Sequence, residues 1–154
     1  MGNRYFVGRV ASAGLLTGAV LSLACATVKA PILAVDSLKV GDMGMTGVAF
    51  DVGFRIRNPN PEPLTIEGFE YELFVNGNRL GRGFESRGLE LAGYGDAKVK
   101  TRFDVNLLSL PGTVKDVLRD DRVRARAKGR FHASGAFGTR DLNFDSDAEV
   151  QLTK

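Results

Sequence analysis

Residues 48–61 read VAFDVGFRIRNPNP, and this stretch decides the fold because strict alternation is followed by an abrupt stop. Apolar residues recur at every second position, as in a strand with one buried face: Val48, Phe50, Val52, Phe54 and Ile56. The strand ends at a turn motif made of Asn58, Pro59, Asn60 and Pro61. Its two prolines remove backbone donors and disfavour helix in the residue before each, so we predict an enforced turn.

Period-two alternation resumes after this turn. Residues 64–75 alternate, with Gly68 shifting the phase as a β-bulge glycine does. Asn76 and Gly77 predict a tight hairpin, because both tolerate the positive φ that such turns require. Further alternating series follow at 97–105 and 123–133.

Apolar spacing becomes helical in one place only. Leu110, Val114, Val117 and Leu118 share one helical face, which predicts a short helix from Ser109 to Asp120. Short strands between Gly and Asn turns, with one helix, favour a mainly β fold of the sandwich type.

The N-terminus has the layout of a secretory signal. Arg4 and Arg9 precede an uncharged run over residues 10–24, and Cys25, the only cysteine, follows Ala24. This junction resembles a bacterial lipobox, although Ser22 stands where an aliphatic residue is usual. The resemblance implies cleavage after residues 1–24, lipidation of Cys25, a short tether over 25–31 and a domain over 32–154.

Lipidation would tether the protein to a membrane of the cell envelope. Because Ala26 is not the aspartate associated with inner-membrane retention, we expect the outer membrane, facing the periplasm, in a Gram-negative host. The alternatives are a plain signal peptide and a single-span anchor, for which fifteen apolar residues fall short of the roughly 20 required.

Charge argues against a nucleic-acid partner. Removal of Arg4 and Arg9 from the 21 bases leaves 19 bases against 18 acids. A basic partner site must therefore be a local patch.

The residue inventory also argues against an enzyme, a metal site and a cofactor. His132 is the only histidine and Cys25 is assigned to the anchor, so neither a catalytic triad nor a zinc site can be assembled. Asp141, Asp145 and Asp147 lack the glycine and distal glutamate of a calcium loop.

Two alternating basic series are the best candidates for binding an anionic surface. The first projects from one face of a predicted strand and the second from another: Arg122, Arg124, Arg126, Lys128, Arg130 and His132, then Lys98, Lys100 and Arg102. If both strands lie in one sheet, the patch widens toward anionic head groups. The alternative is neutralisation by cross-strand acids, for which the candidates are Glu67, Glu70, Glu72 and Glu85.

The segment FRIRNPNPEPLTI at 54–66, followed by YELFVNG at 71–77, is similar to the type 2 late embryogenesis abundant (LEA) family, also called the Water stress and Hypersensitive response (WHy) domain. The shared elements are the Asn-Pro-Asn turn, Pro-Leu, an aromatic strand, the Asn-Gly hairpin and a later glycine, Gly81 or Gly83. The resemblance spans roughly residues 32–152. It implies an immunoglobulin-like or fibronectin-III-like sandwich, a role in desiccation or stress tolerance, and no catalysis.

Two functions therefore stand as hypotheses. In the first, a lipid-anchored, non-enzymatic domain protects envelope components or partner proteins when water is scarce. In the second, the domain is an envelope binding or transport-accessory module that holds an anionic lipid, a glycan or a peptide.

Overall fold

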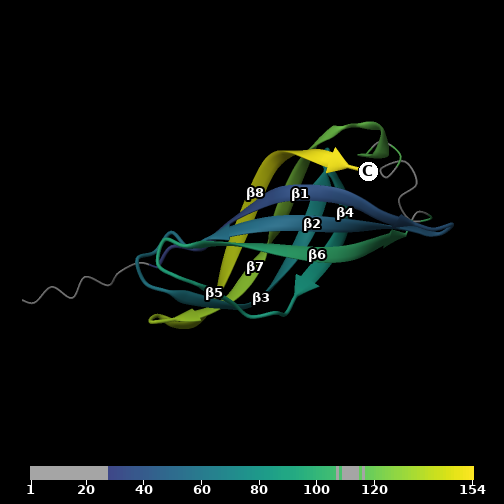
Figure 1. Cartoon of the computed structure of the whole chain (residues 1–154). Coiled ribbons are helices and arrows are strands. Elements are labelled where there is room, and N and C mark those ends of the chain that lie inside the picture. The colour runs from purple at the N-terminus through teal and green to yellow at the C-terminus, as the bar shows by residue number, and fades with distance from the viewer. Residues whose placement is uncertain (1–27, 107, 109–114, 116) are drawn as a thin grey trace, which may run out of the picture.

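The computed structural model describes residues 28–106, 108, 115 and 117–154, and its architecture is almost entirely strand (Figure 1). The strands are β1 (Ile32–Met43), β2 (Gly47–Arg57), β3 (Leu64–Val75), β4 (Asn78–Glu85), β5 (Leu89–Leu91), β6 (Asp96–Asn106), β7 (Arg122–Gly135) and β8 (Gly138–Thr153). The mainly β prediction is confirmed, and β2 covers the alternating stretch that precedes the Asn-Pro-Asn turn.

The strands follow one path, β4-β3-β7-β8-β1-β2-β6, with β5 added beside β3. All neighbours are antiparallel except β1 and β8, which run parallel and pair only at Leu38 with Leu152 and Lys39 with Thr153. This short junction joins the two halves of the sheet. The path then curls until its edge strands β4 and β6 approach each other, which gives a nearly closed barrel.

The expected immunoglobulin-like or fibronectin-III-like sandwich is therefore corrected. A sandwich has two separate sheets face to face, whereas β8 here pairs with β7 along its length and reaches β1 at its end. With 16 residues, β8 is long enough to pass from one half to the other.

Side chains bridge the seam between β4 and β6. A Cβ added at Gly81 of β4 would lie 3.1 Å from the Phe103 ring of β6, so the two strands are close. The Tyr71 hydroxyl and Thr101 Oγ1 are 2.5 Å apart inside the barrel, and the Tyr71 ring occupies the space that a side chain at Gly83 would need. Arg87 Nη2 also donates to the Lys100 carbonyl at 3.1 Å.

Inward-facing residues of every long strand form one core. Its centre is a chain of aromatic rings in contact, with centroids 4.6 to 5.9 Å apart: Phe54, Tyr71, Phe69, Phe131 and Phe144. Such pairs add to the stabilisation from apolar burial. The core leaves outward-facing positions on all walls free for polar residues.

Local predictions agree with the structure where it describes them. The ladder of β3 with β7 shifts between Ile66 and Gly68, and the β3–β4 hairpin has Asn76 and Gly77 at φ 49° and 83°. Of the predicted helix from Ser109 to Asp120, Lys115 and residues 117–119 are helical and Asp120 is not, while 109–114 and 116 lie outside the described residues.

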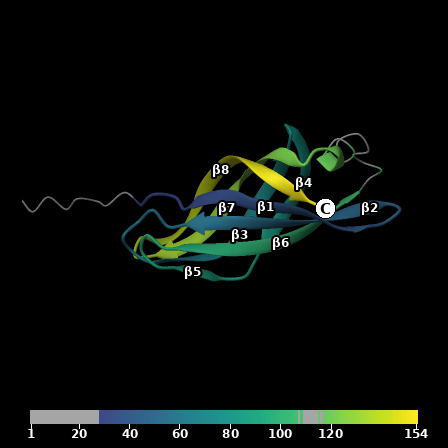
Figure 2. The same cartoon turned by 45° about the horizontal axis from the view of Figure 1, so that its top comes forward.

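The described chain enters at one end of the barrel. Figures 1 and 2 both place the start of β1 there, and the β1–β2 hairpin at the opposite end. In the part of the chain that the structure describes, no helix has the length and apolar character needed to cross a membrane.

Candidate functional site

β7 carries the first predicted basic series on its outer face. Val123, Ala125 and Ala127 point into the core, and the bases between them point outward. Gly129 replaces the next inward side chain because a Cβ there would lie 1.9 Å from the Glu70 carbonyl oxygen. The alternation in the sequence therefore does place all six basic side chains on one face.

The bases face a row of carboxylates on β8. Arg126 Nε and Nη2 each donate to Asp145 at 2.7 Å, and Lys128 Nζ lies 3.7 Å from the same carboxylate. Toward the start of β7, Arg124 Nε lies 3.6 Å from Asp147 Oδ1, and Arg122 Nη1 lies 3.9 Å from Glu149 Oε1.

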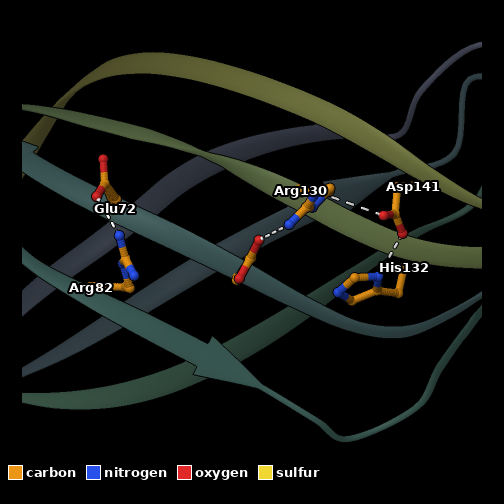
Figure 3. Close-up of polar contacts among 6 residues, drawn as sticks. Glu72, Arg82, Arg130, His132 and Asp141 are labelled. Carbon is orange, nitrogen blue, oxygen red and sulfur yellow. Dashed lines mark hydrogen bonds and ion pairs between the residues drawn. The ribbon is translucent and has the colours of Figure 1, made fainter.

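β3 and β4 continue the pattern on the other side of β7 (Figure 3). Arg130 donates to Glu70 of β3 at 2.5 Å and lies 3.8 Å from Asp141 of β8. His132 Nδ1 is 2.6 Å from Asp141. Glu72 of β3 accepts from Arg79 and Arg82 of β4, at 2.8 and 3.2 Å.

Four neighbouring strands thus carry acids, bases, acids and bases in turn. We call this surface the charge ladder, and its members are Glu70, Glu72, Arg79, Arg82, Arg122, Arg124, Arg126, Lys128, Arg130, His132, Asp141, Asp145, Asp147 and Glu149. The hydrogen bond from Arg126 lowers the pKa of Asp145, and the bond from Arg82 lowers that of Glu72. Both carboxylates therefore stay charged to lower pH than an isolated side chain.

Sequence reasoning found the bases of β7 but neither the bases of β4, Arg79 and Arg82, nor most of the acids. Of the four expected neutralising residues, only Glu70 pairs with a base of β7, namely Arg130. Glu72 pairs with bases of β4 and Glu85 with Arg87, while Glu67 has no base within 4.0 Å among the described residues. The main partners are the carboxylates of β8. Pairing residues outward from the 135–138 hairpin gives the antiparallel register of β7 with β8. This register is the signal in the sequence that identifies the carboxylates of β8 as the partners.

The second predicted basic series does not join the first. β6 is separated from β7 along the sheet by β8, β1 and β2. Lys98 lies 3.2 Å from Asp36 and Arg102 2.5 Å from Asp42. Lys100 and Lys39 line a shallow depression over Gly53. Neither lysine has a carboxylate within 4.0 Å among the described residues.

The Asn-Pro-Asn turn is held by the amides of its own side chains. Asn58 is fully buried, and its Nδ2 donates to the carbonyls of Glu62 and Ala92 at 2.8 and 3.1 Å. Its Oδ1 accepts from the backbone and side-chain nitrogens of Asn60 at 2.9 and 3.0 Å. The turn is therefore a closed polar network with no unpaired buried side-chain atom.

Asn60 connects this network to the start of the described chain. Its Oδ1 accepts from the Lys29 backbone at 2.8 Å, and its Nδ2 donates to the Lys29 carbonyl at 2.8 Å. Its own carbonyl accepts from the Tyr94 backbone at 2.9 Å. We call Asn58, Asn60 and the Lys29 backbone the tether clamp, which the sequence did not reveal because its parts are 31 residues apart.

The Asn-Gly hairpin lies against the charge ladder. Asn76 Oδ1 accepts from the Arg124 backbone at 3.0 Å, and the Asn76 backbone donates to the Arg124 carbonyl at 2.9 Å. Asn76 therefore caps the end of the β3–β7 ladder in addition to forming the turn.

Within the described residues, no group of three His, Cys, Asp or Glu side chains is arranged to hold a metal ion. Asp141, Asp145 and Asp147 instead face bases of β7. His132 is partly exposed and bonds Asp141. Cys25 lies outside the described residues.

A family model described as late embryogenesis abundant protein, of type 2, matches residues 53–148, which include the Asn-Pro-Asn turn and most of the charge ladder. The chain belongs to the type 2 LEA family. This membership supports a stress-related role for the LEA protein, in a family that is generally non-enzymatic. No curated protein matches the chain.

Solved structures resemble this LEA protein in fold. A solution structure of an Arabidopsis thaliana protein has a TM-score of 0.62 at 15% identity, over 82% of this chain and 85% of that one. A solution structure of a candidate LEA protein has a TM-score of 0.50 at 15% identity, over 80% of this chain and 72% of that one. At such identities the likeness shows the fold alone.

Proposed function

We propose that this LEA protein is a non-enzymatic lipoprotein of the WHy type, anchored through Cys25 to a membrane of the cell envelope, that protects neighbouring molecules when water is scarce. Family membership supports the stress-related part of the proposal. The signal-like N-terminus and Cys25 support the anchored part.

The charge ladder is the observation that carries the protective role. Its ion pairs are exposed, with about half of the Arg126 and Asp145 side chains accessible, so each adds little stability in water. Attraction between opposite charges grows as the dielectric constant of the surroundings falls. The ladder should therefore strengthen on drying, when the hydrophobic effect, which depends on water, weakens.

This response explains how a folded domain can act as a shield. Carboxylates and guanidinium groups already within bonding distance have a partner that replaces lost water. The surface then keeps its shape during drying and separates neighbouring proteins and membranes.

The protective role is tested by drying the protein with vesicles of phosphatidylethanolamine and phosphatidylglycerol. One variant neutralises Asp145, Asp147 and the three bases that pair with them, and a matched control reverses the same charges so that these pairs are kept: Arg124→Gln, Arg126→Gln, Lys128→Gln, Asp145→Asn and Asp147→Asn against Arg124→Asp, Arg126→Asp, Lys128→Glu, Asp145→Arg and Asp147→Arg. Infrared spectra of the dried film report strand content, and dye release on rehydration reports protection.

We expect both variants to fold in water and only the neutral one to lose strand content and protection when dried. Equal behaviour of the neutral variant and the unmodified protein on drying would refute the role of the ladder. Anchoring is tested separately, by the intact mass of membrane-extracted protein beside Cys25→Ala. Cleavage before residue 25 with added acyl mass, lost in the variant, is the expected result.

Binding of an anionic envelope component is a second candidate function. The pairing of β7 with β8 makes the first basic series a poor site, whereas Lys39 and Lys100 share a depression with Asp51 and have no carboxylate within 4.0 Å among the described residues. Replacing both lysines with glutamate should abolish binding of an anionic glycan or peptide, while Arg124→Glu should leave it nearly unchanged. The opposite ranking would place the site on β7.

A further inference from the structure

We propose that the domain stands end-on at the membrane, with the Asn-Pro-Asn end against the lipid head groups and Tyr94 in the interface. The inference rests on the proposed membrane attachment and adds the orientation and the contact. It draws on the tether clamp, the exposure and backbone conformation of Tyr94, and the short chain between Cys25 and residue 28.

The distance from the anchor to the domain is short. Cys25 is three residues before Val28, and three residues span at most about 11 Å. Lys29, the next residue, is already bonded to Asn60. If the chain were instead held by an uncleaved 10–24 segment, the membrane would lie on the same side, so either form of attachment brings this end of the barrel to the lipid.

Tyr94 is held beside the point where the chain enters the domain. Its backbone nitrogen donates to the carbonyl of Asn60, the residue whose side chain holds Lys29. Gly93 lies next to Pro61, where a Cβ would be only 1.8 Å from the Pro61 carbonyl oxygen, so the two loops pack backbone against backbone. A membrane within reach of Cys25 is therefore within reach of Tyr94.

The Tyr94 side chain makes no hydrogen bond or ring contact with the described residues. Its side chain is 63% exposed, and its φ of 57° lies in the left-handed region that favours glycine. An exposed aromatic residue kept in a strained conformation points to a function outside the fold. A phenol is well suited to the head-group region, where its ring meets apolar chains and its hydroxyl meets water.

The charges at this end balance, so the contact need not depend on anionic lipid. Lys29 and Arg57 have no carboxylate within 4.0 Å among the described residues, and Glu62 and Asp96 have no base within the same distance. Docking should therefore occur on neutral phosphatidylcholine and resist salt, unlike attraction by a basic patch.

The opposite end supplies an internal control. Met45 is 99% exposed at the β1–β2 hairpin, and β1 has 12 residues, which extend about 40 Å. In the end-on orientation Met45 lies well above the membrane, whereas in a side-on orientation both ends lie near it.

The test uses full-length protein extracted from membranes and reconstituted in phosphatidylcholine vesicles. Ala92→Cys, beside Tyr94, or Met45→Cys is labelled with an environment-sensitive fluorophore and exposed to lipid carrying a head-group spin-label quencher. In the proposed lipoprotein the sulfur of Cys25 is bound to a diacylglyceryl group, so the parent protein without an added cysteine should not label. A parent that labels has a free Cys25 thiol, which overturns the proposed anchoring and this inference with it.

We expect several-fold stronger quenching at position 92 than at position 45, unchanged in 1 M NaCl. Tyr94→Gly should reduce the quenching at 92 severalfold while keeping or raising the melting temperature, because glycine relieves the left-handed backbone. Asn60→Ala should reduce the quenching at position 92 because it releases Lys29. Asn143→Ala, on β8, should leave that quenching unchanged.

Equal quenching at positions 92 and 45 in membrane-bound protein overturns the end-on orientation and leaves the proposed anchoring intact. Unchanged quenching in Tyr94→Gly overturns the role of Tyr94. Recovery of the chain only in the soluble fraction overturns both the anchoring and this inference, and the fractionation distinguishes that outcome from the first two.

Discussion

The tether clamp and the charge ladder solve the same problem, the placement of polar groups, in opposite ways. The clamp uses two neutral side-chain amides that are almost completely buried, and their hydrogen bonds are to backbone groups or to each other. The ladder uses charged side chains that are largely exposed and share partners, as Arg126 and Lys128 share Asp145. Burial, more than charge, should therefore decide how much each group stabilises the hydrated fold.

The largest effect should come from the buried amide of the clamp. Asn58→Ala leaves the Glu62 carbonyl and two Asn60 N–H groups without their partner and removes one of the two donors to the Ala92 carbonyl, and we expect a loss of about 3 kcal/mol in the free energy of unfolding. Urea denaturation measures it. Asn143→Ala, at an exposed position of β8, is the matched control and should change little; equal losses would contradict the role of burial.

A buried carboxylate should come next. Glu85 accepts three bonds from Arg87, which also reaches β6, and we expect Glu85→Gln to cost about 1.5 kcal/mol at pH 7. The Arg87 side chain lowers the Glu85 pKa, so this stability is present above about pH 4.5 and is lost as pH falls through the folded-state pKa. In an acid titration, the free energy of unfolding should fall less steeply with decreasing pH for the variant than for the unmodified protein. Parallel curves would contradict a stabilising role for the Glu85 carboxylate.

The neutral bond across the barrel should matter somewhat less. Tyr71→Phe removes the hydroxyl that meets Thr101, at a cost of about 1 kcal/mol near neutral pH. Burial raises the Tyr71 pKa above its ordinary value of 10, so the stability is present below about pH 10 and is lost as pH rises through the folded-state pKa. As pH rises above about 10, the free energy of unfolding should fall less steeply in the variant than in the unmodified protein. An unchanged pH dependence would show that the Tyr71 pKa does not differ between the folded and unfolded states.

The smallest effect in water should come from the charge ladder. Arg126→Gln should lower the melting temperature by about 1 °C at low ionic strength and not at all in 1 M NaCl. Arg140→Gln removes an arginine without a carboxylate within 4.0 Å among the described residues and controls for net charge. A salt-independent loss specific to Arg126 would mean that the ladder stabilises by packing.

The sequence was informative where a local pattern repeats. Alternation located β2, β3, β6 and β7, and the Asn76–Gly77 pair located a hairpin, because backbone geometry at these places depends on near neighbours. It gave no strand for β1, whose ladder shifts between Val35 and Ser37 and again between Val40 and Met43. Bulges of this kind break the period on which such a prediction depends.

Long-range closure was outside the reach of periodicity. Alternation predicts a buried face but does not say whether β8 will meet β1, so a sandwich and a barrel are alike in sequence. The same limit applies to the site: the bases of β7 followed from spacing, whereas the clamp depends on Lys29 meeting Asn60 across the fold.

The two-residue junction of β1 with β8 also sets an order of events. Leu38 must wait for Leu152, which is made more than a hundred residues later, so the two halves cannot join until nearly the whole chain has been synthesised. Such distant pairing slows folding. For a protein proposed to cross a membrane before it folds, this delay keeps the polypeptide unfolded during transport, and the barrel closes only after the chain has crossed.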